Sequence, residues 1–208
     1  PADHQFQGSV HVQLPSGLGQ IVLPPLLALQ RQHPALHLTL SLDDRIADLV
    51  SEGVDVALRL SAEPPQSHAA RLLMRIETAL FAAPGFQAVH SVSELAAHPH
   101  VRFSGIPRDA PLRLIAGEET IDVKVHTVFR ANTSDALLQA LESGIGIGGM
   151  QLPLAAKALQ AGTLVPVLPA WRLPDRYLYA VYPDARFIPQ RVRSVIQVIE
   201  QILPTLAK

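Results

Sequence analysis

Apolar and polar positions along the first third of the chain follow the pattern of strands joined by helical crossovers. Val10 and Val12 stand between polar neighbours over 8–14, which predicts a short strand that ends at the turn Pro15-Ser16-Gly17. A helix should follow to about Gln32, and the two prolines within it indicate either a start near residue 24 or a kink there. Two more strands are expected at 37–42 and 54–60, with a short helix between them at 46–52.

This succession is β-α-β-α-β, the order of an open parallel sheet. Consecutive parallel strands with right-handed helical crossovers build such a sheet, and it binds ligands beyond the carboxyl ends of its strands. The loops after Leu14, Leu42 and Leu60 are therefore candidate ligand-binding loops.

A second set of strands and helices occupies most of the remaining chain. The turn Gly117-Glu118-Glu119 between apolar stretches indicates a hairpin, and Thr133 or Ser134 suits the cap of a helix. Apolar residues over 189–206 recur with the spacing of one buried helical face, so this last helix should pack on a sheet. The other expected strands are 77–84, 101–103, 112–115, 121–125, 144–150, 164–168 and 177–182, and the other expected helices are 93–97, 153–161 and, after Val128-Phe129, 134–143.

Composition narrows the possible functions more than it narrows the fold. Of 208 residues 48% are hydrophobic and 17% are charged, which supports a buried core in one large domain or two small lobes. The formal net charge is -1 and there is no basic run, so the electrostatic footprint of a nucleic-acid binder is missing. Without cysteine, disulfides and thiolate sites are excluded.

Nothing in the sequence suggests targeting to a membrane. The first residues do not read as a signal peptide, and no apolar stretch reaches the roughly 18 residues that a span requires. We therefore expect a cytoplasmic chain with no membrane partner. Because the chain starts with proline and reaches a strand almost at once, we also expect it to be a fragment of a longer protein.

Three stretches of the sequence resemble one protein family. Residues 43–59 read D-D-R-I-A-D-L-V-S-E-G-V-D-V-A-L-R, which looks like the signature D-R-x-x-D-L-V-x-E-G-x-D-V-A-x-R of LysR-type transcriptional regulators. Residues 132–140 with 144–148, and the later Gly162-Thr163-Leu164-Val165, are similar to the next conserved stretches of that family. The strand at 179–183 and the helix behind it resemble its closing elements. The chain departs from the family pattern at 85–89.

The resemblance implies the effector-binding domain of such a regulator. The expected fold is α/β and periplasmic-binding-protein-like, of type II, with two Rossmann-like lobes joined by two crossover hinges. Lobe I would be discontinuous, over 1–77 and 184–208, and lobe II would cover 78–183. The family's N-terminal winged helix-turn-helix is absent here, so DNA would be a partner only through that missing domain. The resemblance further implies a small-molecule effector, with a carboxylate as one candidate, a homodimer or homotetramer, and no cofactor.

Five candidate effector contacts fall in lobe I. Ser16 and the backbone amides of Gly17 and Leu18 come after the first strand and open a helix, where exposed N–H groups hold an anion or a carbonyl; the alternative is an ordinary turn. Asp43 follows the second strand. Arg59 suits bidentate pairing with a ligand carboxylate, and pairing with Asp43, Asp55 or another acid of the chain is the alternative.

The other five candidates fall in lobe II. Phe103 would supply an apolar wall and Ser104 an orienting hydroxyl, with core packing as the alternative for the ring. Asn132 and Thr133 would add polar contacts, unless they only cap the following helix. Gly146 would permit close approach of the backbone at the edge of the cleft.

Other site types have weaker support. Gly144, Gly146 and Gly149 fit G-x-G-x-x-G, but they precede a strand rather than a helix, which is the reverse of a dinucleotide site. His98 and His100 lack a third ligand at metal spacing, so we expect no metal. Known catalytic motifs are missing, so we expect no enzyme. The alternatives that remain are an extracytoplasmic solute receptor and an enzyme on the same fold.

Overall fold

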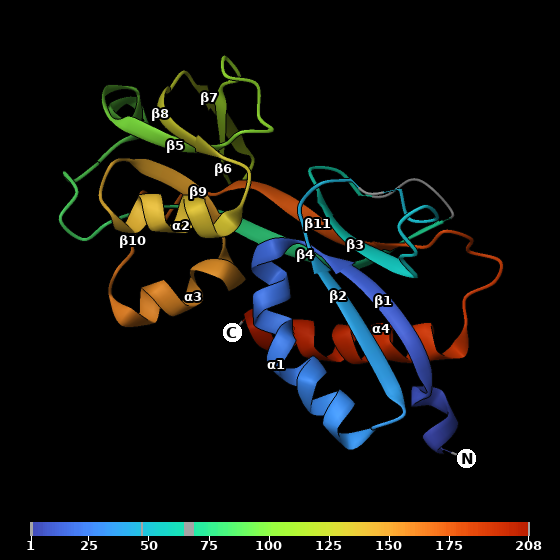
Figure 1. Cartoon of the computed structure of the whole chain (residues 1–208). Coiled ribbons are helices and arrows are strands. Elements are labelled where there is room, and N and C mark those ends of the chain that lie inside the picture. The colour runs from blue at the N-terminus through green and yellow to red at the C-terminus, as the bar shows by residue number, and fades with distance from the viewer. Residues whose placement is uncertain (1, 47, 65–68, 208) are drawn as a thin grey trace. The chain divides into compact units, whose positions relative to one another are not determined.

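The computed structural model describes residues 2–46, 48–64 and 69–207 (Figure 1). The chain forms two compact units, of which unit 1 comprises Pro1–Arg75 and Tyr177–Lys208, and unit 2 comprises Ile76–Arg176. The expected lobe boundaries lay at 77/78 and 183/184. Two strands carry the chain between the units, because β4 (Ala70–Ala82) and β11 (Leu173–Val181) each include one of the boundaries.

Unit 1 is built on a sheet with the strand order β2-β1-β3-β11. β1 (Gly8–Leu14) lies in parallel between β2 (Leu36–Leu42) and β3 (Val56–Ser61), and β3 pairs antiparallel with β11. The 3-10 helix η1 (Ala2–Phe6) precedes β1. The alternation seen in the sequence explains β1, because Val10, Val12 and Leu14 are all at most 1% exposed.

Two helices complete unit 1. α1 (Ser16–Gln32) begins directly after β1 and contains both prolines, so the earlier of the two predicted starts is correct. α4 (Gln190–Ile202) packs against α1 and β1 and is followed by η3 (Leu203–Ala207). The predicted apolar face is confirmed, since Val192, Val195, Ile196 and Ile199 are almost completely buried.

Unit 2 has the strand order β4-β9-β5-β8, with the short β10 (Val165–Pro166) beside β4. β9 (Ile147–Gln151) pairs antiparallel with β4, whereas β5 (Pro99–Phe103) lies in parallel between β9 and β8 (His126–Ala131). β6 (Leu112–Ala116) and β7 (Glu119–Val123) form the predicted hairpin as a separate sheet. The helices are the 3-10 helix η2 (Val92–Ala97), α2 (Ser134–Glu142) and α3 (Leu152–Ala161).

The helix predicted at 46–52 was wrong for the residues that the structure describes. Ala47 lies outside the described residues, and 49–53 form turns. The carboxylate of Asp48 accepts hydrogen bonds from the amides of Val50 and Ser51, and Gly53 adopts a positive φ of 66°. An acidic side chain that binds backbone amides two and three residues ahead favours a turn over a helix.

Candidate functional site

Ser16 lies at the first position of α1, and its donors already have an acceptor within the chain. The register of β1 and β2 places Leu14 beside Leu42, so the start of α1 meets the loop after β2. There Asp44 accepts hydrogen bonds from the Ser16 amide at 3.1 Å and from the Ser16 hydroxyl at 2.5 Å. The N-terminal end of a helix favours an anion, and Asp44 supplies one from inside unit 1.

Asp43 also has partners within its own loop. Its amide donates to the Leu14 carbonyl at 2.9 Å, and its carboxylate accepts from the backbone N and from the Nε of Arg45 at 3.0 and 2.6 Å. The backbone hydrogen bond from Arg45 is the largest of the effects that hold the pKa of Asp43 below its usual range. Arg45 donates in addition to Glu52. Asp43 is therefore one part of a short network that fixes the loop.

The remaining candidates of unit 1 are partly or fully buried. Gly17 and Leu18 are buried in the first turn of α1. Arg59 is partly buried in β3, where it lies opposite Tyr179 of β11. Its two expected acidic partners bind elsewhere, since Asp43 pairs with Arg45 and Asp55 accepts from the His11 amide at 2.8 Å.

Four candidates of unit 2 lie together at the carboxyl ends of β5 and β8. The parallel register pairs Phe103 with Ala131, and the Ser104 amide donates to the Ala131 carbonyl at 2.8 Å. This places Phe103 and Ser104 next to Asn132 and Thr133. Phe103 as a whole residue is 41% exposed, which does not fit core packing.

The two polar residues after β8 differ in their hydrogen bonds. Thr133 is the N-cap of α2, because its Oγ1 accepts from the Ala136 amide at 3.3 Å. Asn132 is exposed, and within the described part of the chain its side chain has no hydrogen-bond partner. Its amide group is therefore open to a ligand.

Gly146 lies apart from these four residues. It precedes β9, whose Ile147 pairs with His100 near the amino end of β5, so Gly146 lies at the opposite end of the strands. It is buried, and a Cβ atom built on it would lie 2.7 Å from the Pro99 carbonyl oxygen. The close backbone approach expected of Gly146 is present, and here it serves the pairing of two strands.

Arg176 is a candidate that the sequence pattern did not single out. It ends unit 2 within β11, it is partly buried, and burial lowers the pKa of its guanidinium. Over the described ranges it makes no hydrogen bond or ion pair. An arginine that is held partly out of water without a counter-ion is a candidate anion contact. Its neighbours in the sequence carry no motif, so only the fold reveals it.

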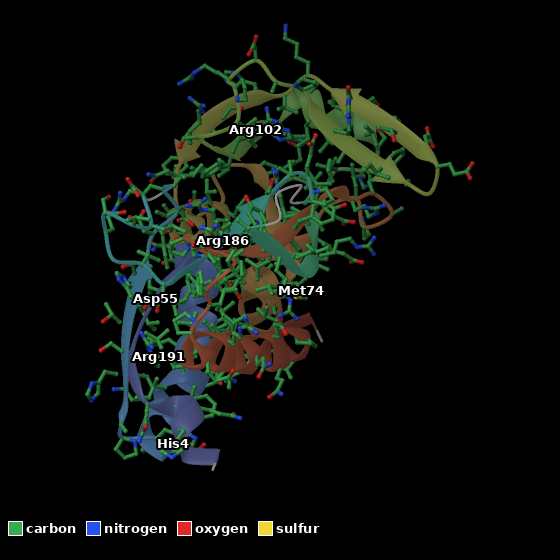
Figure 2. All side chains as sticks on the ribbon, turned by 90° about the vertical axis from the view of Figure 1, so that its right-hand side faces the viewer. His4, Asp55, Met74, Arg102, Arg186 and Arg191 are labelled. Atoms are coloured by element: carbon green, nitrogen blue, oxygen red, sulfur yellow. The ribbon has the colours of Figure 1, made fainter. Side chains whose placement is uncertain are left out.

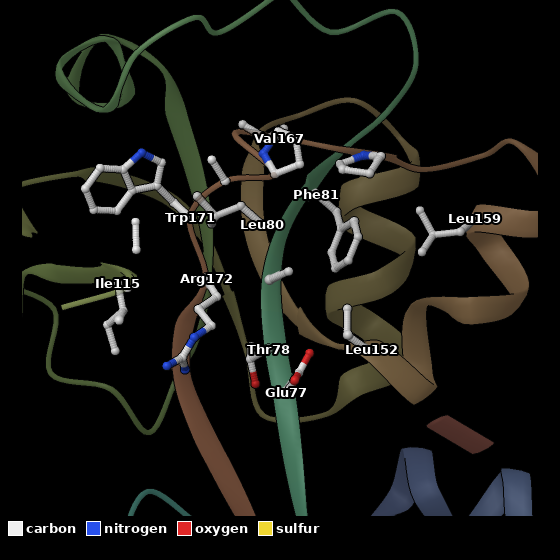
Figure 3. A pocket seen from close by; sticks show the side chains of 16 residues that line it. Glu77, Thr78, Leu80, Phe81, Ile115, Leu152, Leu159, Val167, Trp171 and Arg172 are labelled. Atoms are coloured by element: carbon white, nitrogen blue, oxygen red, sulfur yellow. The ribbon is translucent and has the colours of Figure 1, made fainter. Parts of the chain in front are cut away.

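Unit 2 also contains a hollow of about 360 Å³ over one side of β4 (Figure 3). Leu80, Phe81 and Trp171 contribute apolar walls, and Arg172 reaches it while it pairs with Asp175 at 3.3 Å. Thr78 also lines it, with a buried hydroxyl that has no hydrogen-bond partner among the described residues. None of the ten predicted contacts lines this hollow.

Two further observations concern metals and membranes. Across residues 2–46, 48–64 and 69–207, no three His, Cys, Asp or Glu side chains come together as metal ligands. Within the same ranges, none of the helices has both the length and the apolar character that crossing a membrane demands.

Comparisons with known proteins agree with one another. Residues 3–203 match the model of the LysR substrate binding domain. Over 208 aligned residues the chain is 28% identical to a probable HTH-type transcriptional regulator, LtrA of Klebsiella pneumoniae, and the match covers 96% of this chain and 67% of LtrA. It is 31% identical to the uncharacterized HTH-type transcriptional regulator YhjC of Escherichia coli, over 92% of this chain and 67% of YhjC.

Solved structures show the same fold at lower identity. CrgA of Neisseria meningitidis, a LysR-type transcriptional regulator, superposes with a TM-score of 0.80 at 22% identity, over 99% of this chain and 70% of CrgA. The chain spans 57 to 67% of the length of the first curated relatives that it matches. The fold is thus an α/β fold of the type II periplasmic-binding-protein kind, as the motifs predicted, and the chain belongs to the family of LysR substrate binding domains.

Proposed function

We propose that this chain is the ligand-sensing regulatory domain of a LysR-type transcriptional regulator and that it binds a small-molecule effector. The observation that carries the proposal is the match of residues 3–203 to the family domain, together with polar groups at the carboxyl ends of parallel strands in both units. Ligands of open α/β sheets bind at such ends. The relatives are transcriptional regulators, which supports a non-catalytic role in the cytoplasm.

The charged, polar and apolar residues at these positions suggest which chemical groups of an effector each position recognises. Asp44 already occupies the N-terminal end of α1, so that position presents a carboxylate and favours a hydroxyl or ammonium group of the effector. Phe103 offers an apolar surface and Asn132 an amide. Arg176 offers a partly desolvated guanidinium for an anionic group. A hydroxyl or ammonium group, an apolar body and an anionic group are the parts of a hydroxy acid or an amino acid.

Transmission to DNA would require that the effector bind one arrangement of the units better than another. A switch from 1:99 to 99:1 needs about 5.5 kcal/mol of differential binding, and smaller biases already give graded control. The altered units would then change how a homodimer or homotetramer presents its DNA-binding domains.

The proposal is tested by a thermal-shift screen of small hydroxy acids and amino acids. An acid that raises the melting temperature of the wild-type chain should lose this effect in Asn132→Trp and in Ser16→Trp, because a large ring blocks the contact. Arg176→Gln should weaken binding about tenfold or more by removing the charge-assisted pair. Glu118→Trp, at the exposed hairpin turn, is the matched control. If hits bind all three variants as they bind the wild type, the proposed site is wrong.

A further inference from the structure

Two arginines face the same way on the neighbouring strands β5 and β8. Arg102 pairs in register with Arg130, and adjacent parallel strands lie about 4.8 Å apart. Val101 and Leu141 of α2 both approach the same side of Gly148, so the side chain of Val101 points toward α2. Because successive side chains of a strand point to opposite faces, Arg102 lies on the face of β5 away from α2. Figure 2 marks Arg102 in this part of unit 2.

Both side chains bind the loop that follows β5, and they do so only through backbone carbonyls. Arg102 donates to the carbonyls of Ala110 and of Pro111. Arg130 donates twice from Nη2, at 2.7 Å, to the carbonyls of Ser104 and Ile106. A guanidinium has five N–H donors, so the Nε of Arg102 and the Nε and Nη1 of Arg130 are left without an acceptor among the residues described.

Arg102 and Arg130 differ in their partners from the arginines that form ion pairs. Arg45, Arg113 and Arg186 each bind a carboxylate. Within the described residues, neither Arg102 nor Arg130 has an acidic partner. The two like charges at facing strand positions repel one another, and no carboxylate among these residues compensates for this repulsion. Burial lowers the pKa of Arg102, and the charge of Arg130 lowers it further. A bound anion would relieve this repulsion without disturbing the carbonyl contacts.

We propose that Arg102 and Arg130 together form a binding site for a phosphate group, on the face of β5 and β8 away from α2. The two forks come from adjacent strands, and a tetrahedral dianion has enough acceptor oxygens to take N–H groups from both. Both side chains are partly exposed, so a solvent anion reaches them. The site goes beyond the proposed effector function, because it serves a second ligand, either inorganic phosphate or a phosphate monoester. Since Arg130 also holds the Ser104 carbonyl, phosphate bound here would stiffen the loop after Phe103.

The experiment is a titration of the full chain with inorganic phosphate, with phenyl phosphate and with chloride at matched ionic strength, followed by thermal shift and isothermal calorimetry. Saturable binding of either phosphate beyond the effect of chloride is expected, and the tighter of the two identifies the source of the ligand. Arg102→Gln and Arg130→Gln should each weaken this binding about tenfold or more. Arg113→Gln, which removes an exposed arginine of the same unit from its pair with Asp122, should leave it unchanged.

Because loss of the carbonyl contacts could itself unfold the loop, a lysine variant accompanies these. Arg130→Lys keeps the positive charge and N–H donors for the Ser104 and Ile106 carbonyls but lacks the planar fork, so it should keep its melting temperature without phosphate while it binds phosphate more weakly. Absence of saturable binding to the wild type overturns the proposal. Unchanged phosphate affinity in Arg102→Gln or Arg130→Lys overturns it as well.

Discussion

Substitution of Gly146 by alanine tests whether this glycine is required for the pairing of two strands or for contact with a ligand. The added Cβ would lie 2.7 Å from the Pro99 oxygen and 3.1 Å from the Pro99 carbonyl carbon, and both are backbone atoms that no rotamer change can move aside. An ordinary contact starts at 3.4 Å, so the strands must separate by about 0.7 Å. Such overpacking lowers the free energy of unfolding by about 1–3 kcal/mol. Alanine offsets about 0.4–1 kcal/mol of this loss, because it reduces the conformational entropy of the unfolded chain relative to glycine.

The net expectation is a loss of about 1–2 kcal/mol in the free energy of unfolding, or about 2–8 °C in melting temperature for a chain of this size. Urea denaturation followed by circular dichroism measures the first quantity, and the loss should not depend on any ligand. Gly85→Ala is the matched control, because a Cβ there meets no atom within 4 Å. If Gly146→Ala is as stable as the wild type but loses effector binding, the structural explanation is refuted and Gly146 is a ligand contact.

Two further predictions concern buried polar groups in unit 2. Thr78→Val replaces a buried hydroxyl without a described partner by a methyl group, so the free energy of unfolding should rise by about 1 kcal/mol in urea denaturation; a fall would show that the hydroxyl is hydrogen-bonded. His100 is 1% exposed, and burial holds its pKa below 6.5, so the unfolded chain binds a proton more readily. The stability that this contributes is present above a pH of about 6.5 and is lost as the pH falls toward the lower folded pKa. His100→Gln should therefore flatten the pH dependence of unfolding between about pH 7 and 5, and an unchanged slope would contradict the assignment.

The sequence predicted those elements whose burial follows a simple period. The alternation around Val10 and Val12 led to β1, and the apolar spacing over 189–206 led to α4, because each pattern reports one buried face directly. The segment at 46–52 has a similar apolar spacing, but Asp48 satisfies the next amides with its side chain and so favours turns. β4 starts at Ala70 rather than near residue 77, since its first half is largely exposed and lacks a clear alternation.

The sequence predicted only those parts of the candidate site that the parallel pairing of strands brings together. Phe103, Ser104, Asn132 and Thr133 were placed after two strands, and strands that pair in parallel bring such loops together. The contact from Asp44 to Ser16 and the partly buried Arg176 depend on side-chain distances between segments far apart in the chain. No local motif encodes those distances, so they appear only in the fold.

The discontinuity of unit 1 also has a consequence for synthesis on the ribosome. β1, β2 and β3 are made before unit 2, yet α4, whose apolar face closes over α1 and β1, is made after the whole of unit 2. Unit 2 is one uninterrupted segment and is free to fold as it emerges, whereas the strands of unit 1 that are made before it must wait for α4 with their apolar side chains uncovered. Chaperone dependence and sensitivity to C-terminal truncation should therefore be greater in unit 1 than in unit 2.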